Sequence, residues 1–306
     1  MLVAAVWVLQ RHPGEDWWAT SLLTYGPQVQ WIAPPALALI VTLAARRGFL
    51  SLLNLAALAM ALFFIAGFQL NAPISAPEDA QTLRVATWNV YGRTRDVEMV
   101  ESRLRSWEPD VVCLQESALR TFDGLLPEYE SAHVADLRTY VRGTITNVET
   151  PTIGLHAPRR MLVVEAETAA GPVTIINVHI PRALEFDGTP RELELLAQYM
   201  QEGVAIRDNK FDHILDLLPE AGPAILAGDM NTPPASRFWR RTSEHLTDAF
   251  DAAGRGFGHT FIWRRHLSLL RIDYIWTGGG IRPLHCWIEP ARPSDHRPVI
   301  ADLQMP

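Results

Sequence analysis

The feature that most constrains this chain is a run of 22 residues without a charged side chain, FLSLLNLAALAMALFFIAGFQL, at 49–70. As an α-helix this run would be roughly 33 Å long, enough to cross the ~30 Å hydrocarbon layer of a bilayer. A second uncharged run occupies 29–45, with Pro34 and Pro35 in its first turns, where a missing backbone N–H costs least. Two such runs in tandem predict a transmembrane helical hairpin rather than a buried hairpin of a soluble protein.

The charges around these runs predict an orientation. Arg46 and Arg47 connect the two runs, and basic residues favour the cytoplasmic side of a membrane. The segment 71–82 contains prolines and acids but no base, and we expect it to be a linker. Residues 1–9 are apolar but too few to span, so they form an interfacial segment or the end of a truncated span. The sequence thus predicts a membrane anchor at 1–70 in a bacterial cell membrane, with the domain at 83–306 in the periplasm or outside the cell.

The composition changes beyond residue 79. That part carries 24 of the chain's 27 Lys and Arg and 30 of its 34 acids, a net charge of −6. A mildly acidic surface argues against a tight, non-specific DNA clamp, which needs a basic face. It does not exclude a nuclease, because metal-binding carboxylates are themselves acidic. The two cysteines, Cys113 and Cys286, are too few for a disulfide framework or a zinc cluster.

Short β-rich runs alternate with helical spacing from residue 83 onward. This alternation predicts an α/β layered domain. The stretch from Arg182 to Glu220 is acidic and amphipathic, and we expect two helices there, near the entrance of any site. The strands are expected at 83–90, 110–116, 160–168, 173–180, 224–230, 271–276, 284–289 and 297–303, and helices at 95–107 and 191–218.

Polar residues stand at the ends of several apolar runs, where α/β folds collect their chemistry. They are Asn89, Glu116, His179, Asp229 with Asn231, and Asp273, together with the dipeptide Asp295-His296. The oxygen atoms of Asn89 and Glu116 suit a hard cation such as Mg²⁺, whereas soft metals would call for clustered Cys and His.

The remaining members of this set suit phosphate chemistry. Asp229 is able to take a proton from water while the Asn231 amide donates to a phosphoryl oxygen. His179 and His296 are donors to a phosphate, and either Asp273 or Asp295 is placed to fix the ring of His296. Each residue alone is more often structural, so the prediction of a phosphoryl-transfer site depends on the whole set.

Six motifs in this order resemble the endonuclease/exonuclease/phosphatase superfamily, whose members are similar to deoxyribonuclease I. They are TWNV (87–90), LQE (114–116), NVHIP (177–181), GDMNTPP (228–234), RIDYIW (271–276) and SDHRPV (294–299), and the resemblance covers about 83–305. It implies a four-layer sandwich of two packed mixed β-sheets flanked by helices, with the site at one edge of the sheets.

The resemblance also implies roles for individual residues. Asn89, Glu116 and Asp295 match the metal-binding positions, with Mg²⁺ as the expected ion and Mn²⁺ as the alternative. The catalytic positions are matched by His179, Asp229, Asn231, Asp273 and His296. Two departures stand out. The region 138–151 lacks the family's Ser-Arg strand end, for which Tyr140 and Arg142 are candidate substrate-binding substitutes, and Tyr91 occupies a position that is acidic in apurinic enzymes.

The leading interpretation is a membrane-tethered, divalent-metal-dependent phosphoesterase that attacks a phosphate ester with an activated water. Its substrate would be a phospholipid head group, a nucleotide or a nucleic acid. The alternative is a catalytically inactive, membrane-anchored binding or scaffold module on the same fold.

Overall fold

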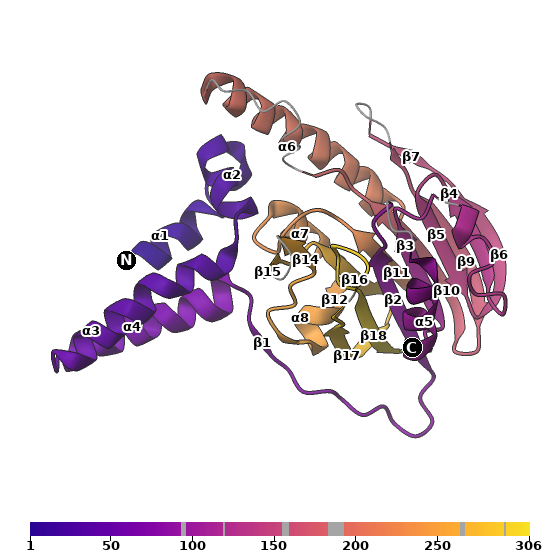
Figure 1. Ribbon diagram of the computed structural model, residues 1–306, viewed down its shortest axis with the longest axis horizontal. Coiled ribbons are helices and arrows are strands. Elements are labelled where there is room, and N and C mark those ends of the chain that lie inside the picture. Colours follow the sequence, from indigo (N-terminus) through magenta and orange to yellow (C-terminus); the bar gives the residue numbers. More distant parts are fainter. Residues whose placement is uncertain (93–95, 119, 155–158, 183–192, 264–266, 291) are drawn as a thin grey trace.

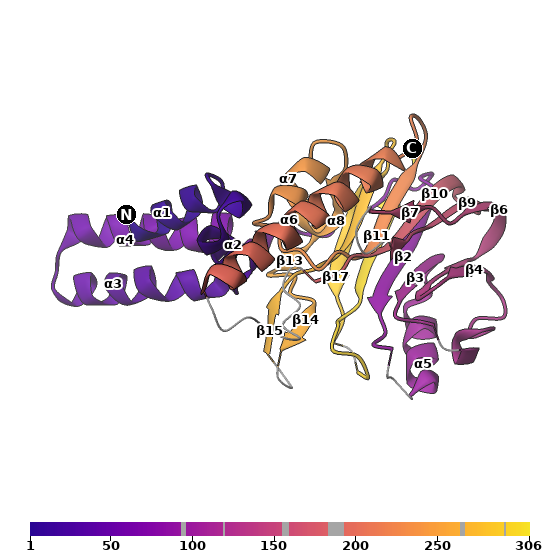
Figure 2. The same ribbon diagram turned by 90° about the horizontal axis from the view of Figure 1, so that it is seen from above.

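The computed structural model describes residues 1–92, 96–118, 120–154, 159–182, 193–263, 267–290 and 292–306. Two six-stranded mixed sheets pack face to face, and helices cover their outer faces (Figure 1). This architecture confirms the expected α/β four-layer sandwich. We call residues 82–306 the body and residues 1–66 the head, which projects from one side of the body (Figures 1 and 2).

Each sheet of the body combines parallel and antiparallel neighbours. The first sheet has the order β12 (Thr247–Asp248), β16 (Asp273–Gly278), β11 (Ala224–Asp229), β10 (Gly171–His179), β9 (Leu162–Thr168), β6 (Gly143–Glu149). The second sheet has the order β17 (Arg282–Ile288), β18 (Val299–Gln304), β2 (Thr82–Asn89), β3 (Val111–Gln115), β5 (Leu137–Val141), β4 (Glu130–Val134).

The alternation of side chains along each strand divides the apolar residues between layers. On β2, Leu83 and Val85 enter the core between the two sheets, whereas Ala86 and Trp88 face outward. The outward residues pack under α5 (Val97–Trp107), and the outer face of the first sheet packs under α6 (Leu193–Asp216) and α7 (Arg237–Thr242). The short helix α8 (Ala249–Ala253) packs against β16 and β17.

The same alternation sends polar groups into the space between the sheets at one edge. The strand β2 runs parallel to β3, and β10 runs parallel to β11, so the carboxyl ends of these four strands meet there. On the antiparallel strand β16, Asp273 lies opposite Asp229 and therefore begins its strand rather than ending it. The antiparallel strand β18 brings the preceding Asp295-His296 to the same edge, since Val299 pairs with Thr87. Six distant motifs converge for this topological reason.

The helix expected at 191–218 is present as α6, which covers 193–216 without a break. The expectation of two helices between Arg182 and Glu220 also involves 183–192, which lie outside the described residues. The apolar positions of this segment suit one continuous helix laid across the first sheet (Figure 2), and no proline interrupts 193–216. Helices were expected at 95–107 and 191–218, and their first residues, 95 and 191–192, lie outside the described residues.

Several short elements complete the body and were not expected from the sequence. The β14–β15 hairpin, Phe261–Trp263 with Leu267–Leu270, stands beside the site edge. The other short elements are η4 (Arg120–Phe122), β7 (Thr152–Ile153), β8 (Arg159–Arg160) and β13 (Arg255–Gly256).

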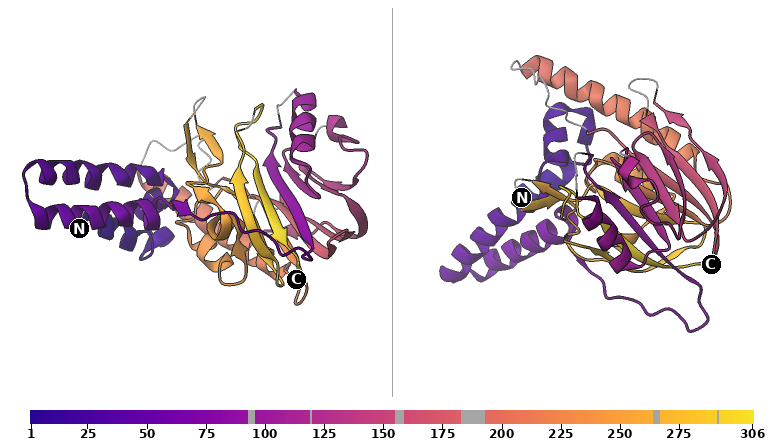
Figure 3. Two further views of the ribbon diagram at one scale, coloured as in Figure 1. Left: turned by 90° about the horizontal axis from the view of Figure 1, so that it is seen from below. Right: turned by 45° about the vertical axis from the view of Figure 1, so that its right-hand side comes forward.

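The head is helical. Its helices α3 (Ala33–Ala44) and α4 (Gly48–Met60) lie side by side as a hairpin with its tip at Arg46-Arg47 (Figure 3). Within the described residues, one helical stretch, Gly48–Ile65, is long and apolar enough to cross a membrane, and Trp18–Tyr25 with Gln28–Ala44 passes the same test only as a pair bent by 90°. The elements of the head are α1 (Leu2–Leu9), η1 (Gly14–Asp16), α2 (Trp18–Tyr25), η2 (Gln28–Ile32), α3 (Ala33–Ala44), α4 (Gly48–Met60) and the π-helical turn η3 (Ala61–Ile65).

The sequence led us to expect a helix over the whole apolar run 49–70, but the helix ends before residue 70. After η3 the chain turns at Gly67, whose φ of 68° is in the left-handed region. Gln69–Leu70 then forms β1, which pairs with β13 of the body. The Asn71 side-chain amide donates to the Asp251 carbonyl at 2.8 Å, so this segment is bound to the body and is not part of a helix.

Ion pairs and hydrogen bonds hold the head against the body. The Arg237 backbone N–H donates to Glu15 Oε2 at 2.6 Å, and the Arg237 guanidinium is 2.6 Å from Asp16 Oδ1. Tyr25 donates to the other oxygen of Glu15 at 2.5 Å, and its ring lies beside the Arg207 guanidinium. The root of the head is therefore placed next to α6 and α7.

Candidate active site

Asp229 is the centre of the polar cluster. Its buried Oδ2 accepts from the amides of Asn89 at 3.0 Å and Asn231 at 3.1 Å, and lies 3.6 Å from His179 Nε2 and 3.8 Å from His296 Nε2. Burial, followed by the negative charge of Asp273, raises the pKa of Asp229 above its ordinary value. A carboxylate with a raised pKa is a better proton acceptor near neutral pH than a solvated one.

The GDMN sequence produces this geometry locally. Gly228 has a φ of 142°, and a Cβ there would lie 2.0 Å from the Val178 carbonyl oxygen of the neighbouring strand. Only glycine permits β10 and β11 to approach so closely at their carboxyl ends. Asn231 takes a left-handed φ of 47°, and its backbone N–H donates to Asp229 Oδ1 at 2.9 Å, which fixes the carboxylate.

His296 is buried and oriented by Asp273. Its Nδ1 lies 3.1 and 3.0 Å from the two carboxylate oxygens of Asp273, which leaves Nε2 directed toward Asp229. Burial alone would lower the pKa of His296, but the charges of Asp273 and Asp229 outweigh it and raise that pKa to about 10. His296 is therefore an imidazolium at neutral pH, with an N–H to donate.

His179 is oriented by a residue that the sequence did not identify. Its Nδ1 lies 2.6 Å from Asp136 Oδ2, in the turn between β4 and β5. Burial opposes the charged ring, but the hydrogen bond to Asp136 and the charge of Asp229 raise the pKa of His179 overall. Both histidines thus direct Nε2 toward the same carboxylate oxygen. The Nδ1 of each is hydrogen-bonded to a different aspartate, Asp136 for His179 and Asp273 for His296.

Glu116 lies on the more open side of Asn89. The Asn89 amide donates to Glu116 Oε1 at 3.1 Å, and the Gly92 N–H donates to Oε2 at 2.8 Å. Burial raises the pKa of Glu116, but these two hydrogen bonds and the charges of His179 and His296 lower it further than burial raises it. Glu116 has a φ of 56°, a conformation costly for a residue with a side chain and common at functional sites.

Asn89 bridges two carboxylates in this geometry. Its Nδ2 donates to Glu116 and Asp229, while its Oδ1 accepts from the Tyr91 N–H at 3.0 Å. A cation held by Oδ1, as the resemblance implies, would require the amide to turn by half a rotation. The metal-binding role of Asn89 stays a prediction.

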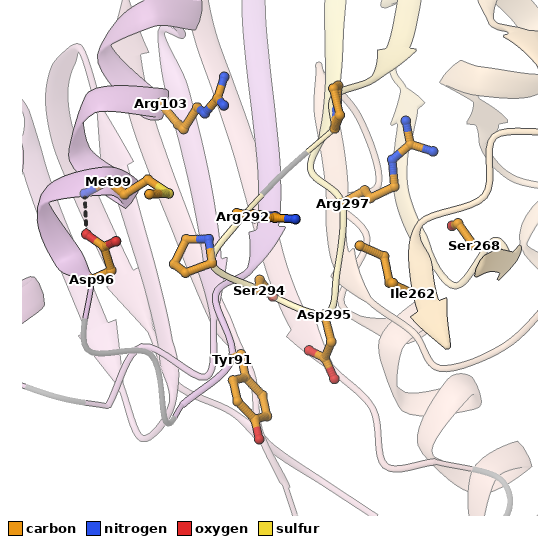
Figure 4. A pocket seen from close by; sticks show the side chains of 12 residues that line it. Tyr91, Asp96, Met99, Arg103, Ile262, Ser268, Arg292, Ser294, Asp295 and Arg297 are labelled. Atoms are coloured by element: carbon orange, nitrogen blue, oxygen red, sulfur yellow. Dashed lines mark hydrogen bonds between the residues drawn. The ribbon is translucent and has the colours of Figure 1, made fainter. Parts of the chain in front are cut away.

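Asp295 borders the cluster from a large open cavity. This cavity of about 1130 Å³ is lined by Tyr91 and Asp295, whose side chains point the same way in Figure 4. It is also lined by Arg103, Arg292 and Arg297. The charge of Asp295 contributes to the raised pKa of His296, which places the carboxylate within electrostatic reach of the ring.

Tyr140 and Arg142 are not brought to this cluster. Tyr140 is completely buried in the layer between the second sheet and α5, where its hydroxyl donates to the Phe122 carbonyl. The register of β5 against β3 pairs Arg138 with Leu114 and Val141 with Val111, so Arg142 follows at the opposite edge of the sheet. There its guanidinium donates to the Tyr129 hydroxyl at 2.7 Å.

Buried polar residues support the cluster from behind. Ser294 donates to the Asn89 carbonyl at 2.6 Å and accepts from the His296 N–H at 3.0 Å, so it ties two motifs together. Gln115 donates to Asn177 at 2.8 Å, and the Asn177 amide donates in turn to the carbonyls of Leu114 and Arg138. These bonds cross from one sheet to the other and satisfy groups that would be costly if unpaired.

Sequence reasoning missed these supporting residues for different reasons. Gln115, Asn177 and Ser294 lie inside the motifs LQE, NVHIP and SDHRPV, so their position was a usable signal. Asp136 carried no signal in the sequence, because an acid in a hairpin turn is ordinarily a solvated turn residue.

Two sets of side chains offer ligand atoms for a divalent cation. Within the described residues, the ligand atoms of Asp229, Asp273 and His296 lie within 4.8 Å of one another, and all three residues are buried. A cation at this group requires His296 to give up its Nε2 proton, because an imidazolium has no lone pair to offer a metal. The carboxylates of Glu116 and Asp295 are oxygen ligands on the accessible side and are the better match for a hard cation.

The arrangement therefore combines a buried carboxylate able to accept a proton, two imidazole donors and an amide donor around one point. Such a set is able to bind a tetrahedral oxyanion and to move a proton to and from its oxygens.

Comparisons with known proteins agree with this geometry. A model of the family described as "Endonuclease/Exonuclease/phosphatase family" matches residues 86–296, from the second strand to His296. A comparison with curated protein sequences finds no match.

Solved structures share the fold of the body. An endonuclease/exonuclease/phosphatase from Bacteroides vulgatus is 20% identical with a TM-score of 0.59, over 74% of this chain and 99% of that chain. A 3′ phosphatase, NExo, from Neisseria, bound to a product DNA hairpin, is 18% identical with a TM-score of 0.56, over 72% of this chain and 98% of that chain. An AP endonuclease from Archaeoglobus fulgidus is 18% identical with a TM-score of 0.55, over 72% of this chain and 98% of that chain.

Proposed function

The chain belongs to the Endonuclease/Exonuclease/phosphatase family, and we propose that it is a membrane-tethered, divalent-metal-dependent phosphoesterase. Members of this family hydrolyse phosphate esters, and a divalent metal is their general cofactor. The observation that carries the proposal is the convergence on Asp229 Oδ2 of Asn89, Asn231, His179 and His296, all within 3.8 Å.

In the proposed reaction, Asp229 accepts a proton from a water molecule whose oxygen attacks phosphorus. The new P–O bond forms as one P–O ester bond breaks, and His296 gives its Nε2 proton to the departing oxygen. Asp273 keeps His296 protonated for this step, since its charge favours the imidazolium. After turnover, His296 and Asp229 return to their starting protonation states by exchange with solvent.

Asn231 and His179 would bind the phosphoryl oxygens. The Asn231 amide and His179 Nε2 both point to the Asp229 carboxylate, so a phosphate placed beside it meets two donors from different strands. Such donors are most valuable where negative charge grows during the reaction.

The proposed metal ligands are Glu116 and Asp295, with Asn89 after rotation of its amide, and the proposed ion is Mg²⁺ or Mn²⁺. When bound, the cation would neutralise charge on the phosphoryl group and the leaving oxygen.

We further propose that the helical hairpin crosses the membrane and tethers the body, with η2 and α3 (28–44) as one span and α4 with η3 (48–65) as the other. With the Arg46-Arg47 tip on the cytoplasmic side, the body would lie in the periplasm or outside the cell. The apolar side chains of the hairpin point outward, as they do in helices that meet lipid, and the 18 residues of α4 and η3 extend roughly 27 Å. The division into anchor (1–70), linker (71–82) and catalytic domain (83–306) is part of this proposal.

The test uses the full chain in detergent with bis(p-nitrophenyl) phosphate as substrate. Release of p-nitrophenol is expected with Mg²⁺ or Mn²⁺, to be lost on chelation and to fall roughly 1,000-fold in Asp229→Ala. Asp302→Ala is the matched control, because Asp302 is a strand aspartate paired with Arg84 away from the cluster. Absence of release with every divalent metal would overturn the proposal, and phosphate binding without turnover would favour an inactive binding module.

A further inference from the structure

A second cavity, of about 520 Å³, opens beside the catalytic cluster. Its volume is within the range of about 300–1,000 Å³ typical of small-molecule sites. Most of its wall is apolar and comes from the β14–β15 hairpin and the residues after it, namely Phe261, Trp263, Leu269, Leu270 and Ile272. We call it the apolar cavity.

The apolar cavity begins at the catalytic groups. Asn231 lines it, and the same Asn231 amide is 3.1 Å from Asp229 Oδ2. Phe261, also in its wall, lies edge-on to the His296 ring with 5.2 Å between ring centres. Arg182 completes this end, with its guanidinium 5.7 Å from the Phe261 ring. A phosphate held at the cluster would therefore have one of its ester substituents directed into apolar surroundings.

The β14–β15 hairpin separates this cavity from the arginine-lined cavity of Figure 4. Side chains alternate along a strand, so Phe261 and Trp263 face the apolar cavity while Ile262 faces the other. On β15, Leu269 lines the apolar cavity and Ser268 lines the other. The site thus has an apolar side and a charged side, the latter lined by arginines and by Asp96 and Asp295, which fits a phosphate ester with one hydrocarbon substituent and one polar substituent.

The opposite wall of the apolar cavity comes from the head. Tyr25 ends α2 and Pro27 precedes η2, and Tyr25 is fixed there by its hydrogen bond to Glu15. The chain continues from Pro27 through η2, which contacts β15, into α3, whose Leu37 and Ile40 are about two-thirds exposed. The cavity is therefore placed where the outward-facing apolar surface of the head meets the catalytic groups of the body.

We propose that the substrate is a phosphate ester of a membrane lipid, whose hydrocarbon chain occupies the apolar cavity. This inference depends on the phosphoesterase function proposed above. A polynucleotide is the less suitable substrate, because the part of the chain beyond residue 79 has a net charge of −6, whereas polynucleotide binding favours a net basic surface. The arginine-lined cavity receives the polar substituent of the lipid phosphate.

The experiment measures chain-length dependence with alkyl p-nitrophenyl phosphodiesters that carry a methyl, butyl or octyl group. Because each buried methylene adds favourable transfer free energy, kcat/KM for the full chain should be at least 10-fold higher for octyl than for methyl. Leu269→Glu introduces a charge into the cavity wall and should abolish this gain. Leu267→Glu is the matched control, two positions away on the same strand and outside the cavity, and should keep the gain.

The outcomes separate the two proposals. Hydrolysis of the methyl ester without any gain for octyl, or a gain that Leu269→Glu retains, would overturn the lipid assignment and leave the phosphoesterase intact. A higher kcat/KM for thymidine p-nitrophenyl phosphate than for the octyl ester would overturn it in favour of a nucleotide. No hydrolysis of any ester would remove both. If Leu269→Glu melts earlier than the wild type, Leu269→Ala takes its place, and the wild-type chain-length series remains a test by itself.

Discussion

The head exposes far more of its apolar surface than the body does, although the head also has a small buried apolar cluster of Val3, Val6, Ala61 and Ile65. In the body, apolar side chains fill three buried clusters, and polar groups gather at one edge of the sandwich. In the head, small polar side chains are buried, and the Gln10 amide donates to the Gln28 side chain at 2.6 Å. Large apolar side chains such as Phe49 and Leu52 are meanwhile exposed by 74% and 66%.

This contrast indicates that the two regions are built for different surroundings. Water drives apolar groups into the body, as in any soluble domain. Exposed apolar helices with polar groups inside are unfavourable in water but suit hydrocarbon, where polar side chains must find partners within the protein. The proposed membrane tether follows from this difference. Of the four predictions below, the second tests the tether directly.

The largest effect is expected from removing the same side chain in the two regions. Leu226→Ala leaves a cavity under α6 and should lower the free energy of unfolding by about 2–5 kcal/mol. Leu53→Ala removes a leucine that is half exposed, and should change it by less than about 0.5 kcal/mol. Denaturant melts of the full chain in detergent measure both values. Equal losses would contradict the contrast between the regions.

The second effect concerns the medium around the head. Leu53→Arg places a charge on the outward face of α4, which costs about 3 kcal/mol within a membrane. The fraction of protein retained in carbonate-washed membranes should therefore fall severalfold. Val148→Arg, on an exposed position of β6, is the control and should be retained like the wild type. Wild-type retention of Leu53→Arg would count against lipid contact at this face.

The third effect concerns the polar edge of the body. Asp273→Asn removes the main charge that raises the pKa of His296, so the imidazolium should be lost at a lower pH than about 10. The alkaline limb of the pH profile of kcat/KM should move down, and the rate at pH 8 should fall about 10-fold. Asp302→Asn should leave the profile unchanged. An unmoved alkaline limb in Asp273→Asn would show that Asp273 does not hold the proton on His296.

The last effect lies at the junction of the two regions and depends on pH. His259 stacks on Phe257, which itself lies edge-on to Phe68 at the end of the head. Burial lowers the pKa of His259 to about 4, below the ordinary 6.5. The unfolded chain therefore binds this proton more readily, so this contribution to stability is complete above pH 6.5 and is lost as the pH falls toward 4.

His259→Gln should accordingly reduce the loss of stability between pH 7.5 and pH 5 by about 2 kcal/mol, because the unfolded imidazole is protonated over this range while the folded one is not. Denaturant melts at the two pH values measure it. His133→Gln, at an exposed position of β4, serves as the comparison. The same acid sensitivity in His259→Gln and the wild type would contradict the assignment.

The sequence by itself determined the fold class, the family and most of the cluster. Polar residues at the ends of apolar runs, together with the order of the motifs, identified Asn89, Glu116, His179, Asp229, Asn231, Asp273 and His296, because the place where an apolar run ends is a local property of the sequence. The end of the apolar run 49–70 was misjudged, because apolar residues also form strands, and only pairing with β13 distinguished β1 from a continuing helix.

Other features existed only in three dimensions. Asp136 became the partner of His179 because the β4–β5 turn folds back to the end of β10, a contact between residues 43 positions apart. Tyr140 and Arg142 were expected at the site, but strand register buried the first and carried the second to the far edge. The apolar cavity needs residues from 25 to 272, so no local pattern could reveal it. Local spacing fixes which way a side chain points along its strand, whereas the neighbours it meets depend on how distant strands pair and pack.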